Sequence, residues 1–315
     1  MDVSVVIPLF NKAPHVEAAV RSALDQSLSP REVLVVDDGS TDGGLEVVRA
    51  IDDPRLKVLT RTRPGPGGYA ARNHGVRHSA GEWIAFLDAD DLWLPDHLTD
   101  MARAVAACGE PVGGVFTRFE VKEAGRDRVY PVAEDILTPG RAMSLPTIVR
   151  AWLSTRSCPI WTGACAFRRD VLVEAGLFPE GRARRGGDKD MWLRAIARVK
   201  TAFAPEVSVE FHQDTVNRVT TSTGHTDLPI IARTIRELLS EAGPEERKLL
   251  RALSNQEVAL YARYATGARM KVDSSFLASI YLPQGLREAA TVLLLHLAGP
   301  LIGSLRTKWR LRTNT

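Results

Sequence analysis

Short apolar runs alternate with segments of helical periodicity over the first half of the chain. The runs at 3–9, 32–37, 56–60 and 83–88 are each short enough for a buried strand. After the first run, apolar residues recur at the spacing of one helix face, namely Val16, Ala19, Val20, Ala23 and Leu24. This alternation predicts an α/β fold with βα units and a parallel sheet.

The pattern changes further along the chain. A helix at 96–107 and a strand at 114–119 are followed by a charged, weakly periodic stretch at 122–146, which we expect to be irregular. A strand at 161–168 and a helix at 188–199 come next, and from about residue 226 the pattern favours helices alone, including 228–239 and 245–265. We therefore predict an α/β domain over residues 1–215 and a helical C-terminal extension over residues 216–315.

The end of the chain is apolar and then basic. Residues 289–305 are largely apolar, interrupted by His296, Gly299 and Pro300, and four basic residues follow between 306 and 312. The apolar stretch falls short of the ~20 residues that span a bilayer. One interpretation is an interfacial anchor on anionic lipid at 286–312. The other is a core or dimerisation helix with a solvated basic tail.

Composition narrows the class of protein only slightly. With 315 residues, 44% hydrophobic and 25% charged, the chain is ordinary for a globular protein. A net charge of +3 is too mild to indicate nucleic-acid binding. Three cysteines without a CxxC pair argue against a disulfide framework or zinc knuckle, and no signal-peptide pattern opens the chain. We expect a cytoplasmic protein, at the inner face of the cell membrane if the C-terminus binds lipid.

Acidic residues end two of the predicted strands. Asp37 and Asp38 follow one, and Asp88, Asp90 and Asp91 follow another. The carboxyl ends of parallel strands form one rim, where ligands bind, so these acids should face a shared crevice. Two close carboxylates suit Mg²⁺ or Mn²⁺, which prefer oxygen ligands. The alternative is that Asp90 or Asp91 merely caps a helix beginning near 94–95.

Two common nucleotide motifs are absent. The glycine-rich loop at 64–68 is not followed by Gly-Lys-Ser/Thr, and no Gly-x-Gly-x-x-Gly follows the first strand. A P-loop phosphotransferase and a Rossmann dehydrogenase are therefore disfavoured.

Four segments, taken in order, resemble the signature of family-two inverting glycosyltransferases. They are SVVIPLFN at 4–11, VVDDGSTD at 35–42, ARNHG at 71–75 and FLDADD at 86–91. The resemblance implies a GT-A fold, which is a Rossmann-like mixed sheet flanked by helices, with a donor half at about 1–119 and an acceptor half at about 120–215. It implies transfer of one sugar, with inversion, from a nucleotide-diphospho-sugar to an acceptor hydroxyl. UDP is the expected nucleotide, and cell-surface polysaccharide or glycolipid biosynthesis the expected setting. Processive members carry Gln-x-x-Arg-Trp, and no Arg-Trp pair occurs here.

The resemblance also implies individual roles around the donor. Asp90 would bind Mn²⁺ or Mg²⁺, Asp88 would contact the ribose or the metal, and Arg72 would contact the diphosphate. Asp38 would accept hydrogen bonds from uracil. The remaining nucleotide pocket would be lined by Pro8, Phe10 and Asn11. The family often has Tyr in place of Phe10, so stacking is retained without a hydroxyl contact.

Near the acceptor, DKDMWLR at 188–194 resembles the family's acidic element. Inversion needs a base for the acceptor hydroxyl, and the alignment makes Asp188 that base, while Asp190 supports the helix start. The family's preceding glutamate is Gly187 here, and a helix N-cap is the alternative for Asp188. His212, at the end of a strand, corresponds to a metal- or phosphate-contacting histidine, with a purely structural role as its alternative.

Two other functions remain open from the sequence. A nucleotidyltransferase would use a similar acidic crevice but would need a triphosphate loop that is not evident near the first strand. A catalytically silent sugar-nucleotide-binding protein is suggested by Gly187. The expected partners are the donor and a glycan or lipid-linked glycan acceptor, with no nucleic acid; the oligomeric state is left open.

Overall fold

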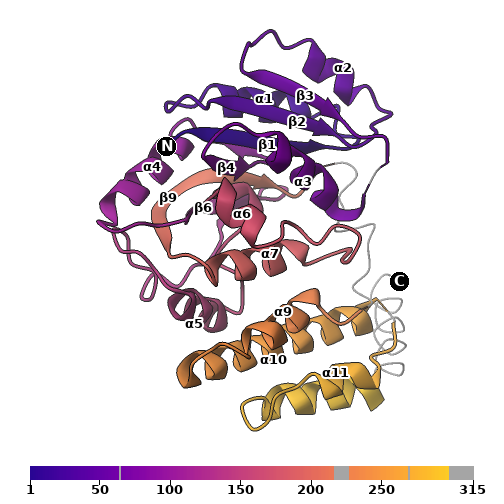
Figure 1. Cartoon of the computed structure of the whole chain (residues 1–315). Coiled ribbons are helices and arrows are strands. Elements are labelled where there is room, and N and C mark those ends of the chain that lie inside the picture. The colour runs from indigo at the N-terminus through magenta and orange to yellow at the C-terminus, as the bar shows by residue number, and fades with distance from the viewer. Residues whose placement is uncertain (64, 216–226, 269, 298–315) are drawn as a thin grey trace. The chain divides into compact units, whose positions relative to one another are not determined.

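The computed structural model describes residues 1–63, 65–215, 227–268 and 270–297. Contacts divide the chain into two compact units, residues 1–218 and residues 219–315. The first holds the sheet and the second is helical (Figure 1).

The first unit is built on one mixed sheet. Its strand order is β3-β2-β1-β4-β8-β6-β9-β5, and β7 pairs with β6. The strands are β1 (Val3–Leu9), β2 (Glu32–Asp37), β3 (Leu56–Thr60), β4 (Trp83–Phe86), β5 (Leu92–Trp93), β6 (Gly114–Lys122), β7 (Arg128–Val129), β8 (Cys165–Arg168) and β9 (Thr201–His212). Strands β1 to β4 are mutually parallel where they pair, whereas β8 is antiparallel to both β4 and β6. Strand β9 is parallel to β6 and antiparallel to β5.

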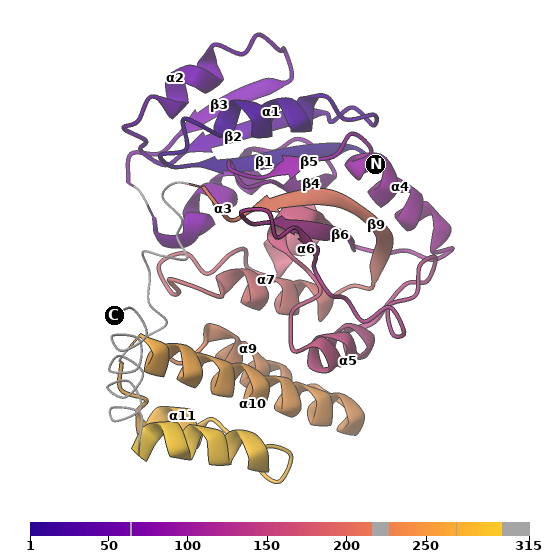
Figure 2. The same ribbon diagram turned by 180° about the vertical axis from the view of Figure 1, so that it is seen from behind.

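Helices cover both faces of this sheet (Figures 1 and 2). One face packs into a core with α1 (Val16–Leu24), α2 (Gly44–Arg49) and α4 (His97–Ala107). On the other face lie α3 (Tyr69–His78), α6 (Arg169–Glu174) and α7 (Gly187–Ile196), where Trp192 stacks on Phe167 with ring centroids 5.1 Å apart. The unit also contains α5 (Leu145–Thr155) and the short 3₁₀ helices η1 (Pro66–Gly68) and η2 (Thr162–Ala164).

A glycine lets α3 lie close to the sheet. A Cβ on Gly75 would stand 2.4 Å from Val6 Cγ1 on β1. Such a distance is far inside van der Waals contact, so a larger residue would push α3 outward. Since α3 carries residues of the candidate site, this contact helps to set the site's geometry.

The second unit is helical, as the sequence indicates. It contains α9 (Ile230–Leu238), α10 (Pro244–Gly267) and α11 (Ser274–Ala278), and residues 286–297 form a further helix. Its core includes Val258, Ala262, Phe276 and Val292. Within the described part of the chain, no helix has both the length and the apolar character needed to span a bilayer. The basic residues at 306–312 lie outside the described residues.

The predicted fold class is confirmed, and several bounds differ, two of them in kind. Strand 161–168 is shorter than predicted, because residues 162–164 form η2 before β8 begins. The stretch at 122–146 was expected to be irregular; it contains the short strand β7 and ends where α5 begins. The division into donor and acceptor halves stays a prediction.

Candidate functional site

The carboxyl ends of β1, β2 and β4 lie at one edge of the sheet because the three strands are parallel neighbours. The segments that follow them therefore meet, as we predicted from the rule that the carboxyl ends of parallel strands form one rim. Direct contacts confirm this meeting: Asn11 after β1 bonds the turn after β2, and Lys12 bonds Asp90 after β4.

The two acids after β2 have different surroundings. Asp37 accepts hydrogen bonds from the backbone N–H groups of Gly39 and Ser40, which shapes the turn. Asp38 accepts a 2.5 Å hydrogen bond from Arg61 Nη1 and a 2.9 Å hydrogen bond from Gly65 N. Burial raises the pKa of Asp38 above its ordinary value, although both donors favour its charged form. The carboxylate of Asp37 is thus bound by backbone N–H groups of the turn, while that of Asp38 is bound by Arg61 at the rim.

The predicted pocket residues after β1 are at the same edge. Asn11 has a φ of 52° and accepts a 2.8 Å hydrogen bond from Thr41 N through its Oδ1. Phe10 is exposed over 48% of its surface, so its ring is accessible for stacking. Pro8, still within β1, is partly buried and lies beside the glycine loop, since a Cβ on Gly68 would be 3.7 Å from Pro8 Cβ.

Arg72 connects the glycine loop to the first acid of the Asp88–Asp91 cluster. Its Nη2 donates to Asp88 Oδ1, and its Nη1 donates to Gly67 O at 2.9 Å. The guanidinium lies 5.7 Å from the centre of the Phe178 ring and is almost fully buried. The guanidinium is a donor that can bind an anion such as a diphosphate, in competition with the Asp88 carboxylate.

Asp90 is held by two donors. Lys12 Nζ lies 2.5 Å from Asp90 Oδ2, and Thr215 Oγ1 donates to the same oxygen at 2.6 Å. The side chains of Lys12 and Asp90 are only 11% and 17% exposed. The carboxylate predicted to bind a metal is therefore paired with an ammonium group in this structure.

Asp91 plays a structural part beneath these acids. Its Oδ1 accepts a 2.8 Å hydrogen bond from the backbone N–H of His212 on β9. Burial, together with the nearby carboxylates of Asp88 and Asp90, holds the pKa of Asp91 well above its ordinary value. Neither Asp90 nor Asp91 caps a helix, because α4 begins at His97 with Asp96 as its N-cap.

His212 meets the acidic cluster through its backbone alone. Its ring Nε2 lies 3.1 Å from Glu210 Oε2, two residues back on β9. Its role as a metal or phosphate ligand stays a prediction.

Asp188 and Asp190 both lie in the first turn of α7, where Gly186 is the N-cap. The N-cap alternative for Asp188 is therefore wrong. Asp190 is buried and accepts from Arg194 Nε at 3.1 Å and Nη2 at 2.8 Å. Asp188 is half-buried, and among the described residues its carboxylate makes no hydrogen bond or ion pair.

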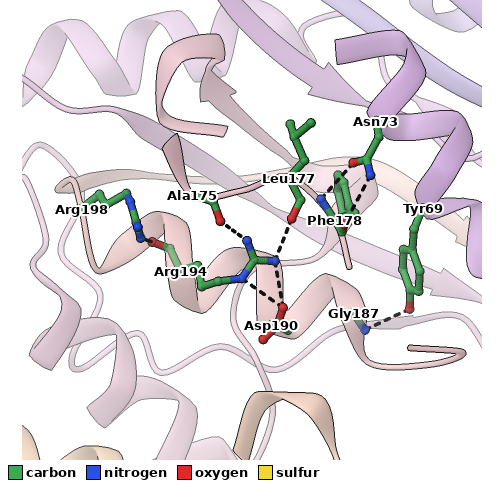
Figure 3. Close-up of polar contacts among 9 residues, drawn as sticks. All are labelled: Tyr69, Asn73, Ala175, Leu177, Phe178, Gly187, Asp190, Arg194 and Arg198. Atoms are coloured by element: carbon green, nitrogen blue, oxygen red, sulfur yellow. Dashed lines mark hydrogen bonds and ion pairs between the residues drawn. The ribbon is translucent and has the colours of Figure 1, made fainter. Parts of the chain in front are cut away.

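One face of α3 fixes the segment leading into α7 (Figure 3). The Asn73 amide accepts from Phe178 N at 2.9 Å and donates to Phe178 O at 3.0 Å. One turn earlier, the Tyr69 hydroxyl accepts a 2.9 Å hydrogen bond from Gly187 N. Burial, and then the charge of Asp188, raises the pKa of Tyr69, so the phenol stays protonated. Helix α3 thus positions both Arg72 at the Asp88–Asp91 cluster and the start of α7.

Packing explains why glycine stands at 187. A Cβ there would lie 2.6 Å from Pro179 Cγ and 2.8 Å from Tyr69 Cζ. The Tyr69 ring and Pro179 occupy the space that a side chain would need, so the glutamate expected from the family cannot fit in this arrangement.

The donor set at the rim fits a divalent cation that arrives with a substrate. Within the described residues, no group of three or more His, Cys, Asp or Glu side chains is placed to hold a metal. Mg²⁺ and similar ions, however, are often bound by one or two carboxylates, with substrate phosphates completing the shell. Asp88 and Asp90, both part-exposed, provide that number of hard oxygen ligands.

Four residues of this arrangement were not predicted from the sequence: Lys12, Arg61, Tyr69 and Thr215. Arg61 directly follows β3, which is parallel to β2, so its place at the rim could have been predicted from strand direction. Lys12 and Thr215 are far apart in the sequence, and no local pattern indicates that they share Asp90 as a partner.

Comparison with known proteins places these features in a family. The family model described as Glycosyl transferase family 2 matches residues 4–175. Succinoglycan biosynthesis protein ExoO of Rhizobium meliloti (strain 1021) is 42% identical over 158 residues, which cover 50% of this chain and 44% of that protein. The Escherichia coli UDP-Glc:alpha-D-GlcNAc-diphosphoundecaprenol beta-1,3-glucosyltransferase WfgD is 36% identical over 96 residues, covering 30% of this chain and 38% of that protein. The chain thus spans about half or less of the length of these curated relatives.

Solved structures share the fold. S. aureus TarS 1-349 in complex with UDP-GlcNAc superposes with a TM-score of 0.73 at 18% identity, covering all of this chain and 93% of that one. The mannosyltransferase PcManGT from Pyrobaculum calidifontis, in complex with GDP-Man and Mn²⁺, superposes with a TM-score of 0.54 at 21% identity. The match covers 94% of this chain and 86% of that one. Since the family model matches more than half of the sequence, the chain belongs to glycosyl transferase family 2.

Proposed function

We propose that this protein transfers one sugar from a UDP-linked donor to an acceptor hydroxyl, with inversion at the anomeric carbon. The observation that carries the proposal is the meeting of Asp38, Asp88 and Asp90 at one rim, with α3 joining that rim to Asp188 on α7. The donor at the rim and the acceptor at Asp188 would then meet at one reacting centre.

The donor would be bound by its base, ribose and diphosphate. Asp38 accepts hydrogen bonds from uracil, and Phe10 provides a ring on which the base stacks, with Pro8 and Asn11 lining the pocket. Asp88 contacts the ribose or the metal, and Arg72 neutralises charge on the diphosphate. The name of WfgD mentions UDP-Glc and the TarS structure is a complex with UDP-GlcNAc, which supports the choice of UDP.

Asp188 would act as the base. Its carboxylate takes the proton of the acceptor hydroxyl as the hydroxyl oxygen attacks the anomeric carbon, and the bond to the diphosphate oxygen breaks on the opposite face. Its lack of a hydrogen-bonding partner among the described residues leaves it accessible to an acceptor. The Tyr69 contact to Gly187 positions the turn that carries it.

Asp90 and Asp88 would hold Mn²⁺ or Mg²⁺ beside the diphosphate, with His212 as a further candidate ligand. When bound, such an ion supplies Lewis-acid stabilisation of the charge that develops on the departing nucleoside diphosphate. The Mn²⁺ named with PcManGT supports this choice of cofactor.

The acceptor would be a glycan or lipid-linked glycan of a cell-surface polysaccharide or glycolipid pathway, reached at the inner face of the membrane. The names of ExoO and WfgD support this class of acceptor. The exposed leucines of helix 286–297 and the basic sequence after it support peripheral contact with lipid.

A donor panel tests the proposal. UDP-, GDP- and dTDP-sugars are incubated with Mn²⁺, and release of nucleoside diphosphate is measured for wild type, Asp90→Asn and Asp188→Asn. Asp52→Asn is the matched control, because Asp52 is exposed and precedes β3, away from the strand ends that carry the site. We expect hydrolysis of a UDP-sugar by wild type and the control, and its loss in both site variants. Binding of the donor without release or transfer across an acceptor panel would favour a silent binding protein instead.

A further inference from the structure

Lys12 occupies the place beside Asp90 where a cation is needed. Its ammonium lies 2.5 Å from Asp90 Oδ2, and both side chains are largely withdrawn from water. Thr215 Oγ1 donates to the same carboxylate oxygen and lies 3.4 Å from Lys12 Nζ. A close pair at such low exposure is much less screened than a surface ion pair.

The charge balance of the cluster indicates why a resident cation is required. Asp88, Asp90 and Asp91 are consecutive or nearly so, and like charges this close repel. The Arg72 guanidinium neutralises Asp88. Asp91 is buried and accepts a hydrogen bond from the backbone N–H of His212. Lys12 supplies the positive charge for the remaining acid, so each acid of the cluster has a cationic or hydrogen-bonding partner without a metal.

We propose that the Lys12 ammonium is the resident counter-ion of Asp90, which a divalent cation must displace in order to bind this carboxylate. The inference rests on the proposed function, because it concerns the metal that would accompany a nucleotide-sugar. It adds a residue to that site and a condition on when the site accepts a metal.

The displacement makes metal binding depend on the donor. A released ammonium needs a new anionic partner, and a diphosphate at the rim provides one within reach of a flexible four-carbon side chain. Without a nucleotide, Mn²⁺ must compete with Lys12 and Thr215 for Asp90 Oδ2 and gains no phosphate ligand. With a nucleoside diphosphate bound, it gains phosphate ligands while Lys12 gains another partner. Mn²⁺ and the nucleotide therefore favour each other's binding, and thermodynamic linkage requires the effect to be reciprocal.

The test measures Mn²⁺ binding to the full chain by the loss of the free-ion paramagnetic resonance signal, with and without UDP. In Lys12→Met, which keeps the length of the side chain and removes its charge, we expect Mn²⁺ affinity without UDP to rise by about tenfold or more. The factor by which UDP strengthens Mn²⁺ binding should fall accordingly. Lys12→Arg should behave like wild type.

Two controls locate the effect. Lys200 Nζ lies 2.5 Å from Glu110 Oε2, so this ion pair is as short as that of Lys12, but Lys200 precedes the start of β9, whereas Thr215 follows its end. Lys200→Met should therefore leave Mn²⁺ binding unchanged. Adding Asp90→Asn to Lys12→Met should abolish the gain. If Lys12→Met fails to fold, Lys12→Gln replaces it, with folding checked by thermal unfolding.

Unchanged Mn²⁺ affinity in folded Lys12→Met without UDP, or a gain that survives Asp90→Asn, overturns the inference. Failure of the proposed function looks different: wild type would bind no nucleotide or nucleotide-sugar under any cation condition. The Mn²⁺ measurement without UDP requires neither turnover nor an acceptor.

Discussion

Two aspartates on the first turn of α7 differ in what surrounds them, and this difference separates their roles. Asp190 is buried against Arg194, which also donates to the backbone oxygens of Ala175 and Leu177 (Figure 3). Asp188 is half-buried and without a hydrogen-bonding partner among the described residues. The same substitution at the two positions should therefore affect different properties.

We expect Asp188→Asn to lower kcat by at least about a hundredfold with little change in stability, since a positioned base is lost. Asp190→Asn should lower the free energy of unfolding by about 3 kcal/mol, because Arg194 is left with an uncompensated charge. Turnover and urea unfolding measured side by side check this pair. Unchanged turnover in Asp188→Asn would contradict its assignment as the base, and equal loss of stability in both variants would contradict the separation of the two roles.

Because of His97, the free energy of unfolding should decrease as the pH falls. Burial lowers the pKa of His97 to about 3, and its Nδ1 is 2.8 Å from Ser208 Oγ. The unfolded chain has an ordinary histidine pKa of about 6.5, so it binds more protons than the native state between pH 6.5 and 3. The contribution of His97 is thus fully present above pH 6.5 and falls as the pH drops, by up to about 1.4 kcal/mol per pH unit.

Urea unfolding of wild type and His97→Gln at pH 7.5 and pH 5 measures this contribution. Glutamine can keep a hydrogen bond to Ser208 but does not titrate, so the variant should lose less stability on acidification. An identical pH dependence of the two proteins would mean that other groups cause the acid sensitivity.

At the scale of elements, α3 is the connection between the two parts of the candidate site. It presents Arg72 to Asp88, while Tyr69 and Asn73 hold the segment that leads into α7. Close packing at Gly187 completes this connection. A shift of α3 would therefore move the donor contacts and the start of α7 together.

Gly187→Ala should disturb this connection. The added Cβ would overlap Pro179 and Tyr69, and overpacking of this kind costs about 1–3 kcal/mol. We expect lower stability together with reduced turnover, because Asp188 is the next residue. Gly267→Ala is the control, since a Cβ there meets nothing within 4 Å. Wild-type turnover in Gly187→Ala would show that the packing around Tyr69 does not set the position of Asp188.

The sequence predicts elements better than it predicts their contacts. Strands β1, β2 and β3 have the predicted bounds, because each is a short apolar run ended by polar or turn residues. Helix α5 was missed, although Leu145, Ile148, Val149 and Trp152 follow helical spacing and Pro146 lies at its first turn. The meeting of acids at the rim follows from strand direction. The pairing of Lys12 with Asp90 depends on tertiary packing, which no local pattern encodes.

At the scale of the whole molecule, the second unit presents apolar surface. Leu286, Leu293, Leu294 and Leu297 are exposed on helix 286–297, while Val292 is buried in the core of that unit. The sequence beyond this helix continues apolar and ends with basic residues at 306, 308, 310 and 312. Exposed leucines followed by positive charge match a membrane surface with anionic headgroups better than a neutral protein surface.

Leu293→Glu combined with Leu297→Glu should therefore weaken binding to vesicles that contain phosphatidylglycerol by at least about tenfold. Burying one leucine contributes about 1.5–3 kcal/mol, and each basic residue near an anionic surface adds about 1 kcal/mol. Cosedimentation measures binding, and added salt should weaken it through screening. Val173→Glu, which adds a negative charge at an exposed apolar position on α6, should bind like wild type. If the leucines instead form a contact between two copies, the double variant would change the molar mass in solution, and vesicle binding would be absent from wild type.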